Sequence, residues 1–228
     1  MLDVGCGSGW IVNGLAYHHK IKGLGIDINP NAISMGKNVS NKLKLSSKFE
    51  NIDLFNFKTN LKFDMITSYG VLHHTKDCHE AVKYISKFLK NDGVLMLGLY
   101  NKKARGPFLD YFNKLKNQGF SENYIKGIYS EFSYNNLYKG DSSMLESIFY
   151  DQVYSPYETQ HSFIEIRDLL QSIGYTVVLT SINDYRHIDN TEDWESLENS
   201  LYISAKENIS SKSLDFGFFT IIAKKSSI

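Results

Sequence analysis

Three alternate glycines near the start of the chain have the spacing of a ligand-binding loop. Gly5, Gly7 and Gly9 stand directly after a short apolar stretch and directly before a helix-like segment. Glycines there let the backbone turn tightly and approach a ligand, and the first turn of a helix offers free N–H donors. A dinucleotide-binding G-x-G-x-x-G loop would need its third glycine at position 10, where the chain has Trp10. The Gly-Lys-Ser/Thr triplet of a phosphate-binding P-loop is also missing from the sequence.

Two acidic residues stand where a bound nucleoside would need hydrogen-bond acceptors. Asp27 ends an expected strand 18 residues past Gly9, and a carboxylate there can accept hydrogen bonds from both hydroxyls of a ribose. Asp53, within the run NIDLF, follows the next expected strand and can accept from an adenine amino group. Each acid taken alone is also typical of a turn or a helix cap. Together with the glycine loop they mark the carboxyl ends of three successive strands, where an open α/β sheet binds its ligand.

Strand-like and helix-like segments alternate over the first hundred residues, and this alternation would position the glycine loop and the two acids. The apolar spacing at positions 81, 82, 85, 88 and 89 is helical, whereas residues 94–100 show the continuous apolar character of a strand buried on both faces. This alternation indicates parallel βαβ units. We expect strands over Leu2–Gly5, Lys22–Ile28, Lys48–Ile52, Phe63–Ser68 and Val94–Tyr100, helices over Trp10–His19, 30–42 and Asp77–Leu89, and a loop over Tyr69–Thr75.

The regular pattern breaks after residue 100. Residues 101–160 are rich in Tyr, Phe, Asn and Lys, and we predict helical insertions that form a cap over the sheet. A helix is then expected over Ser162–Ser172, with strands over Tyr175–Ile182 and Gly217–Ala223. The polar stretch 184–214 is expected to be a long, flexible excursion. The chain of 228 residues is predicted to form one domain.

Composition excludes several classes of function. The 25 basic and 25 acidic residues balance, which disfavours DNA or RNA as the main partner. Two cysteines, Cys6 and Cys78, make neither a disulfide framework nor a four-ligand zinc pattern, so no metal is predicted and a reducing compartment fits. No apolar run approaches the length of a membrane span. We therefore expect a soluble, cytoplasmic protein whose oligomeric state is open.

Five stretches in order, LDVGCGSG, GIDINPNAI, ENIDLF, FDMITSYGVLHHTKD and LKNDGVLMLGLYN, resemble the class I S-adenosylmethionine-dependent methyltransferases. The resemblance covers residues 1–100 together with the last helix and two strands. It implies an α/β, Rossmann-like fold with a seven-stranded, mostly parallel sheet, flanking helices and an antiparallel last strand. Residues 1–100 would be the cofactor-binding half, 101–160 the acceptor-side insertion and 161–228 the closing part. Members of the family normally have a helical segment before the first strand, so an N-terminally truncated chain is expected.

The resemblance also implies the cofactor and the residues that hold it. The cofactor would be S-adenosylmethionine (AdoMet), which leaves as S-adenosylhomocysteine (AdoHcy) after the transfer. Asp27 would bind the ribose, Asp53 would lie near the adenine between Ile52 and Leu54, and Ser68 and Tyr69 would line the methionine end. Cys6 lies within the loop, where its side chain is expected to pack rather than to react. The full set of expected cofactor-binding residues is Asp3, Gly5, Cys6, Gly7, Gly9, Asp27, Ile28, Ile52, Asp53, Leu54, Ser68 and Tyr69.

Catalytic residues are harder to identify, because methyl transfer from a sulfonium is an in-line displacement on an already activated donor. The enzyme mainly holds acceptor and methyl group in line and excludes water, and a base is needed only if the acceptor loses a proton. His73 and His74, in the run YGVLHH, are candidates to orient the acceptor or take a proton, although hydrogen bonding to nearby backbone is an equally good reading. Tyr100 is a third candidate.

The acceptor is expected to be a small molecule. The run SYGVLHH differs from the [D/N]-P-P-[Y/F] motif of methyltransferases that act on adenine or glutamine amino nitrogens, and the charge is neutral. Because insertions at this point of the family commonly cover the acceptor pocket, Arg105, Tyr154, Tyr157 and His161 are candidate acceptor-side residues. The alternative is that these aromatic residues form the insertion's own small core.

Three other functions stay open at this point. The chain could be a truncated or non-catalytic AdoMet-binding member of the family. A nucleotide-binding oxidoreductase is less favoured, because the third glycine of its loop is missing. A nucleic-acid methyltransferase would need a basic face, which the balanced composition does not indicate.

Overall fold

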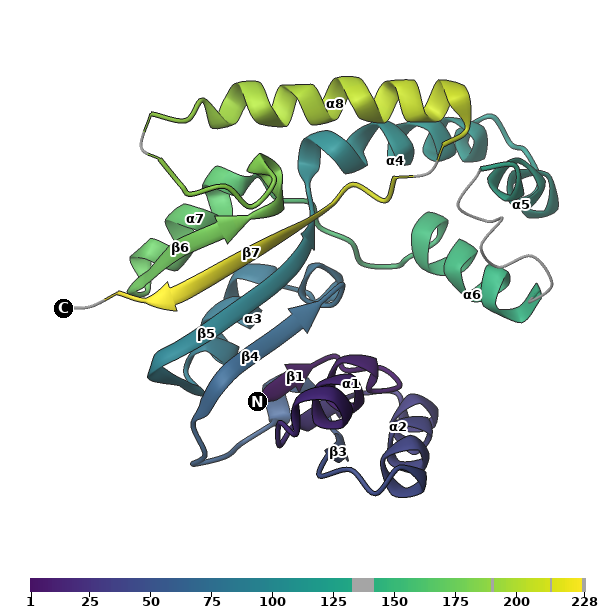
Figure 1. Cartoon of the computed structure of the whole chain (residues 1–228). Coiled ribbons are helices and arrows are strands. Elements are labelled where there is room, and N and C mark those ends of the chain that lie inside the picture. Colours follow the sequence, from purple (N-terminus) through teal and green to yellow (C-terminus); the bar gives the residue numbers. More distant parts are fainter. Residues whose placement is uncertain (133–141, 190, 214, 227–228) are drawn as a thin grey trace. The chain divides into compact units, whose positions relative to one another are not determined.

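The computed structural model describes residues 1–132, 142–189, 191–213 and 215–226 (Figure 1). The chain forms two compact units, each built from separate stretches of sequence. Unit 1 consists of Met1–Leu99, Arg167–Ile188 and Thr220–Ile228, and unit 2 of Tyr100–Ile166 and Asp189–Phe219.

A seven-stranded sheet with the order β3-β2-β1-β4-β5-β7-β6 organises unit 1. The strand β1 pairs in parallel with β2 and β4, β4 pairs in parallel with β5, and β6 pairs antiparallel with β7. The predicted mostly parallel, seven-stranded sheet with an antiparallel last strand is confirmed. Its strands are β1 (Leu2–Val4), β2 (Leu24–Asp27), β3 (Lys48–Asn51), β4 (Phe63–Tyr69), β5 (Leu89–Tyr100), β6 (Tyr175–Thr180) and β7 (Phe218–Lys225).

Four helices flank this sheet, with α1 and α2 on one side and α3 and α7 on the other (Figure 1). The start of α2 follows directly from the sequence: the Asn29 side chain accepts hydrogen bonds from the N–H groups of Asn31 and Ala32, and Pro30 takes the first helical position. The turn between β2 and α2 is therefore fixed next to Asp27. The helices are α1 (Trp10–His19), α2 (Pro30–Lys42), α3 (Cys78–Ser86) and α7 (Phe163–Ser172).

Element boundaries differ from the prediction mainly around β5. We expected Asn91-Asp92-Gly93 to separate a helix from a strand, but β5 already begins at Leu89 and α3 ends at Ser86. An irregularity in the register between Phe63 and Met65 of β4 lets β5 keep pairing through this stretch. The expected loop after β4 is also more ordered than predicted, since Tyr69 belongs to β4 and Leu72–His74 forms a 3-10 helix.

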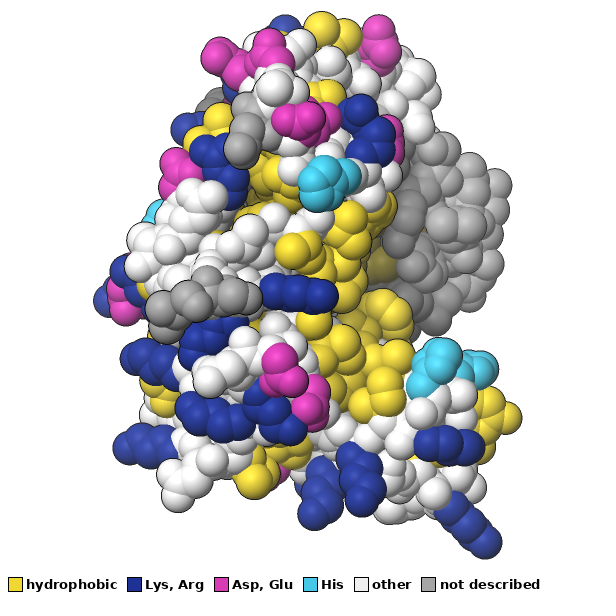
Figure 2. Space-filling view, turned by 60° about the vertical axis from the view of Figure 1, so that its left-hand side comes forward, with side chains coloured by type: hydrophobic (Ala, Val, Ile, Leu, Met, Phe, Trp, Pro, Cys, Tyr) yellow, Lys and Arg dark blue, Asp and Glu magenta, His cyan; other side chains and the backbone are white. Residues whose placement is uncertain are grey.

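The side of the sheet that carries α1 is partly open over β4 and β5. Met65, Thr67 and Tyr69 alternate along β4 with the fully buried Ile66, and they line a cavity of about 490 Å³ together with residues of α1 and Met96. Parallel sheets are usually covered on both faces. The space-filling view shows an open area of hydrophobic side chains on the molecular surface (Figure 2).

Unit 2 has an aromatic core of its own. The prediction of a helical insertion over 101–160 is confirmed for the described residues, which form α4 (Lys102–Asn117), α5 (Glu122–Ser130) and α6 (Ser142–Val153). Residues 133–141 of the predicted insertion lie outside the described part. The buried core consists of Phe108, Phe112, Ile125, Tyr129, Phe132, Phe149 and Val153.

The prediction of a flexible excursion over 184–214 is wrong, because α8 (Trp194–Ser211) occupies most of it and packs along α4 within unit 2 (Figure 1). The ring of Trp194 lies 4.1 Å from that of Phe163, and the buried Glu198 carboxylate accepts hydrogen bonds from the Asn101 side chain and the Phe163 N–H. Few residues of α8 are buried, so the sequence of this helix is mostly polar. Among the described helices, none combines the length and the apolar character needed to cross a bilayer.

Candidate functional site

The glycine loop folds over the carboxyl end of β2. The N–H groups of Gly5 and Cys6 both donate to the carbonyl oxygen of Ile26, at 2.8 and 3.0 Å. All three glycines have left-handed backbones, with φ of 71° at Gly5, 52° at Gly7 and 77° at Gly9. A Cβ atom at Gly5 would lie 2.3 Å from Val71 Cγ2, and one at Gly9 would lie 2.4 Å from Phe49 Cε1. Both packing and backbone conformation therefore require glycine at the two ends of the loop.

Gly5→Ala is expected to destabilise the protein by about 2–5 kcal/mol, because a strained backbone adds to overpacking against Val71. Gly7→Ala is the matched control: its Cβ would meet open space, so only the backbone term of about 1–2 kcal/mol applies. Urea denaturation measures both free energies of unfolding. Adding Val71→Ala to Gly5→Ala should restore part of the loss. Equal destabilisation by the two glycine variants would show that the contact with Val71 is not tight.

Asp27 connects the loop to the start of α2. Its Oδ2 accepts a hydrogen bond from the Gly7 N–H and its Oδ1 accepts one from the Asn29 N–H, each at 2.8 Å. A carboxylate offers about four acceptor positions, so two remain for a ligand. The loop and the acid at the end of β2 are therefore held as one preorganised unit.

A cavity of about 350 Å³ opens at the carboxyl ends of the first four strands. It brings together seven of the residues predicted from sequence: Gly5, Asp27, Ile28, Ile52, Asp53, Leu54 and His74. Its other lining residues, which sequence reasoning missed, are Val4, Ile26, Phe55, Val71, Thr75 and Lys76. The run GVLHHTK after β4 was the available signal for the last three of these, because it continues directly through the predicted His73 and His74.

The far end of this cavity is formed by the segment after β3. The exposed Asp53 caps the short 3-10 helix Leu54–Asn56, and its Oδ1 accepts a hydrogen bond from the Phe55 N–H at 2.8 Å. Leu54 is buried beneath it, and Ile28 reaches into solvent with 68 % of its surface exposed. Apolar side chains and one carboxylate thus meet at this end, a combination that suits a flat aromatic ring with an amino group.

Asp3 lies beneath the loop, in the middle of the sheet. It is 2 % exposed, and its Oδ1 accepts a hydrogen bond of 2.6 Å from the Thr67 hydroxyl on β4. Burial raises the pKa of Asp3 to about 7, the Thr67 hydrogen bond opposes this shift, and the nearby Asp27 charge adds to it. Asp3 does not line the cavity itself, although its neighbours Val4 and Gly5 do.

Three other side chains predicted to bind the cofactor pack or form hydrogen bonds within the fold. Cys6 packs in a buried cluster, and burial raises the pKa of its thiol to about 12, so it is a packing residue. Ser68 is fully buried and donates to the Val4 carbonyl oxygen at 3.0 Å. The Tyr69 hydroxyl lies 2.7 Å from the Thr220 hydroxyl, on the side of the sheet that faces α1. The side chains of Ser68 and Tyr69 thus do not line the cavity near Asp27.

The two histidines after β4 differ in their surroundings. His73 is fully buried, with its ring 4.3 Å from that of His74. His74 lines the cavity, and its backbone N–H donates to the Val71 carbonyl oxygen at 2.9 Å. Of the two predicted catalytic histidines, His74 is the one whose side chain can reach a molecule in the cavity.

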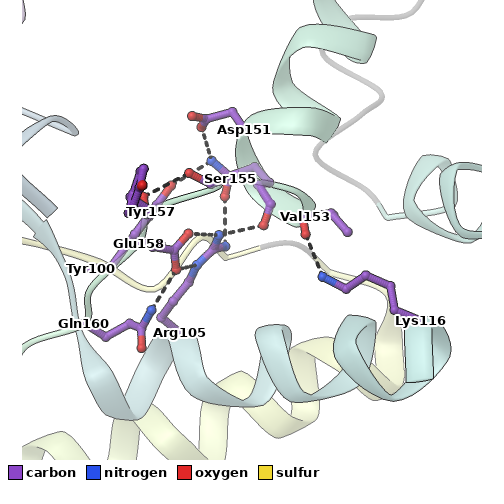
Figure 3. Close-up of polar contacts among 10 residues, drawn as sticks. Tyr100, Arg105, Lys116, Asp151, Val153, Ser155, Tyr157, Glu158 and Gln160 are labelled. Atoms are coloured by element: carbon purple, nitrogen blue, oxygen red, sulfur yellow. Dashed lines mark hydrogen bonds and ion pairs between the residues drawn. The ribbon is translucent and has the colours of Figure 1, made fainter. Parts of the chain in front are cut away.

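Tyr100, the third predicted catalytic residue, is buried in unit 2. Its hydroxyl accepts a hydrogen bond of 2.7 Å from Gln152 Nε2, and the Arg105 guanidinium lies 4.3 Å above its ring (Figure 3). Burial raises the pKa of Tyr100 to about 12. A phenol that keeps its proton so firmly is unsuited to act as a base at neutral pH, so the structure gives Tyr100 a packing role.

Arg105 has a structural role, which corrects its prediction as an acceptor-side residue. Its side chain is fully buried, and its Nε and Nη2 donate to the two carboxylate oxygens of Glu158 at 3.0 and 2.8 Å (Figure 3). Its Nη1 and Nη2 donate to the side-chain and backbone oxygens of Gln152, both at 2.8 Å. All three guanidinium nitrogens thus donate hydrogen bonds that link α4 to α6 and to the segment after α6.

The remaining acceptor-side predictions fall on different parts of unit 2. Tyr154 packs at the margin of the aromatic core, with its ring 5.4 Å from that of Phe149. Tyr157 has 65 % of its surface exposed. His161 is buried, with its Nδ1 2.7 Å from Glu165 Oε1 and its Nε2 2.9 Å from the Thr159 hydroxyl. Of these three side chains, that of Tyr157 is the most accessible to a molecule from solvent.

Comparison with known proteins decides the family. A family model described as "Methyltransferase domain" matches residues 1–209. The chain belongs to this family of methyltransferase domains. The ubiquinone biosynthesis O-methyltransferase of Coxiella burnetii is 30% identical over 106 residues, which are 46% of this chain and 45% of that protein. The mitochondrial protein of the same name from Dictyostelium discoideum is 28% identical over 128 residues, 50% of this chain and 38% of that protein. The match of this methyltransferase domain thus spans less than half the length of each of these two curated relatives.

Solved structures share the fold of the methyltransferase domain. PKMT2 from Rickettsia typhi in complex with AdoHcy superposes with a TM-score of 0.69 at 14% identity, and the match covers 100% of this chain and 48% of that one. At this identity the likeness shows the fold alone. The expectation of a class I methyltransferase fold, drawn from the order of the sequence motifs, is confirmed.

Proposed function

We propose that this methyltransferase domain binds AdoMet in the cavity beside the glycine loop and transfers its methyl group to a small-molecule acceptor. The observation that carries the proposal is Asp27, which is hydrogen-bonded to the loop and lines the same cavity as Asp53. The relatives named ubiquinone biosynthesis O-methyltransferase favour a hydroxyl group as the acceptor. The chain carries no net charge, which argues against a nucleic acid as the acceptor.

The residues present fit the cofactor by size and by chemistry. A cavity of about 350 Å³ lies within the range of ligand sites and takes a nucleoside. Asp27 would accept hydrogen bonds from the ribose hydroxyls, and Asp53 would accept one from the adenine amino group, with Ile28, Leu54 and Phe55 against the ring. The loop from Gly5 to Gly9 would approach the methionine part closely, because glycine leaves its backbone bare.

The protein's contribution to the reaction is mainly positional. AdoMet would supply an activated methyl group, whose bond to sulfur would be exchanged for a bond to the acceptor oxygen while the acceptor hydroxyl gives up its proton. His74, on the cavity wall, is proposed to hold the acceptor hydroxyl or to take that proton. Because Tyr100 is buried with a raised pKa, it is not proposed as a base.

The cellular setting is proposed from the cysteines. The sequence has two cysteines, Cys6 and Cys78, and both are buried. A sequence with too few cysteines for a disulfide framework is typical of a reducing compartment, so a cytoplasmic location is proposed.

Calorimetric titration of the folded protein with AdoMet and with AdoHcy tests the proposal. Both ligands are expected to bind, and NADH is expected not to bind, because the loop lacks the third glycine of a dinucleotide site. A folded protein that binds neither AdoMet nor AdoHcy would contradict the proposed function. Binding of NADH alone would favour an oxidoreductase instead.

A further inference from the structure

The hydrogen bond between Thr67 and Asp3 joins two buried groups at the centre of unit 1. In the parallel pairing of β1 with β4, Asp3 stands opposite Thr67, and each residue is 2 % exposed. The Thr67 hydroxyl donates to Asp3 Oδ1 at 2.6 Å, the short distance expected of a charge-assisted bond to a carboxylate. Val4 and Gly5, which follow Asp3 directly in the chain, line the cavity.

We propose that Thr67 is a positioning residue: its hydroxyl holds the Asp3 carboxylate in its ionised form beneath the glycine loop, and so sets the pH range over which the domain binds a positively charged cofactor. This inference rests on the proposed function, because it concerns how the same cavity recognises AdoMet. Thr67 itself does not line that cavity and is not a catalytic residue.

The groups packed around Asp3 explain why the Thr67 hydroxyl matters. From β2 the Asp27 carboxylate opposes a second negative charge, and from the loop the buried Cys6 thiol supplies no compensating positive charge. Burial acts in the same direction as Asp27, and together they raise the pKa of Asp3 to about 7. The hydroxyl of Thr67, on β4, is the group that lowers it. Without this hydroxyl the pKa of Asp3 must rise further.

The sign of the resulting pH dependence follows from linkage. A positive charge in the cavity beside Asp27 favours the ionised form of Asp3, since the charge of Asp27 on that cavity already acts on Asp3. Binding of AdoMet would then release a proton from Asp3 near neutral pH. Affinity is expected to rise as pH rises through 7, to level off above it, and to fall below it by at most about tenfold per pH unit, the limit for the release of one proton.

Thr67→Val removes the hydroxyl with little change in shape, and Thr67→Ser restores it. We expect Thr67→Val to move the pH profile of AdoMet affinity upward by about one to two units, the value of one hydrogen bond to a charged group. At pH 7 this corresponds to a loss of about five- to fiftyfold, and the profiles should converge as pH rises. Thr67→Ser should follow the original profile, and Asp3→Asn should give affinity independent of pH.

Two controls keep the outcomes distinct. The neutral ligand 5′-methylthioadenosine has neither the sulfonium nor the ammonium group, so its affinity should vary little with pH in any variant. Titration of the unmodified protein with AdoMet in two buffers of different ionisation enthalpy measures proton release directly, without relying on any variant. Absence of AdoMet binding at every pH would contradict the proposed function itself. Binding without proton release, or superimposable profiles for Thr67→Val and the unmodified protein, would overturn this inference alone.

Discussion

Replacing Asp27 by alanine is expected to weaken AdoMet binding by about a hundredfold or more. Hydrogen bonds to a charged group contribute about 1.5–3 kcal/mol each, and the proposed ribose contact would lose two of them. The Gly7 and Asn29 N–H groups would lose their acceptor at the same time, which loosens the loop. Calorimetric titration with AdoMet measures the loss, and circular dichroism verifies that the fold is kept.

Asp64→Ala is the matched control for this prediction. Asp64 is an exposed acid near the amino end of β4, away from the glycine loop, where it pairs with Lys90 at 2.6 Å. Its removal should leave the affinity for AdoMet unchanged. An Asp27→Ala protein that binds AdoMet as tightly as the Asp64→Ala protein would show that the ribose assignment is wrong.

Replacing Arg105 by alanine is expected to lower the free energy of unfolding by about 3–5 kcal/mol. The change leaves the Glu158 carboxylate without its ion-pair partner while its side chain is only 8% exposed. Removing one partner of a buried ion pair typically costs this much stability, because the other charge stays buried and uncompensated. The Gln152 oxygens would lose their donors as well. Urea denaturation followed by circular dichroism measures the effect.

An exposed ion pair in the same chain gives the control. Arg167 pairs with Asp168 at 2.8 Å on the surface of α7, and Arg167→Ala is expected to change stability by less than about 1 kcal/mol. The double variant Arg105→Met/Glu158→Leu should recover much of the loss, because it removes both charges together. An Arg105→Ala protein that is as stable as the Arg167→Ala protein would contradict the structural role and revive the acceptor-side one.

The framework of unit 1 could be predicted because its signals are local. The alternate glycines from Gly5 to Gly9, the acid at the end of each strand and the Asn29-Pro30 helix start are each readable within a few residues. Parallel strands then place these groups at one edge of the sheet without further information. The grouping of Asp27 with Asp53 around one cavity follows from that pattern.

Side-chain direction could not be predicted in the same way. Ser68 and Tyr69 are neighbours in one strand, so they point to opposite faces, and neither side chain lines the cavity. Arg105 was predicted to lie on the acceptor side from its place in the insertion, because its partners Gln152 and Glu158 lie about fifty residues further along the chain. In α8 the few apolar positions are outnumbered by polar ones, which concealed the helix.

The position of β7 in the sheet has a consequence for the order in which the protein is made and folded. This strand, residues 218–225, lies between β5 and β6, so β6 cannot join the sheet until residue 225 has left the ribosome. β1 in turn must wait for β4, about sixty residues further along the chain, before it gains its second neighbour. Contacts so distant in sequence form slowly. The nascent chain therefore holds unpaired strand edges until β7 has been made, and the sheet of unit 1 closes only after translation has passed residue 225.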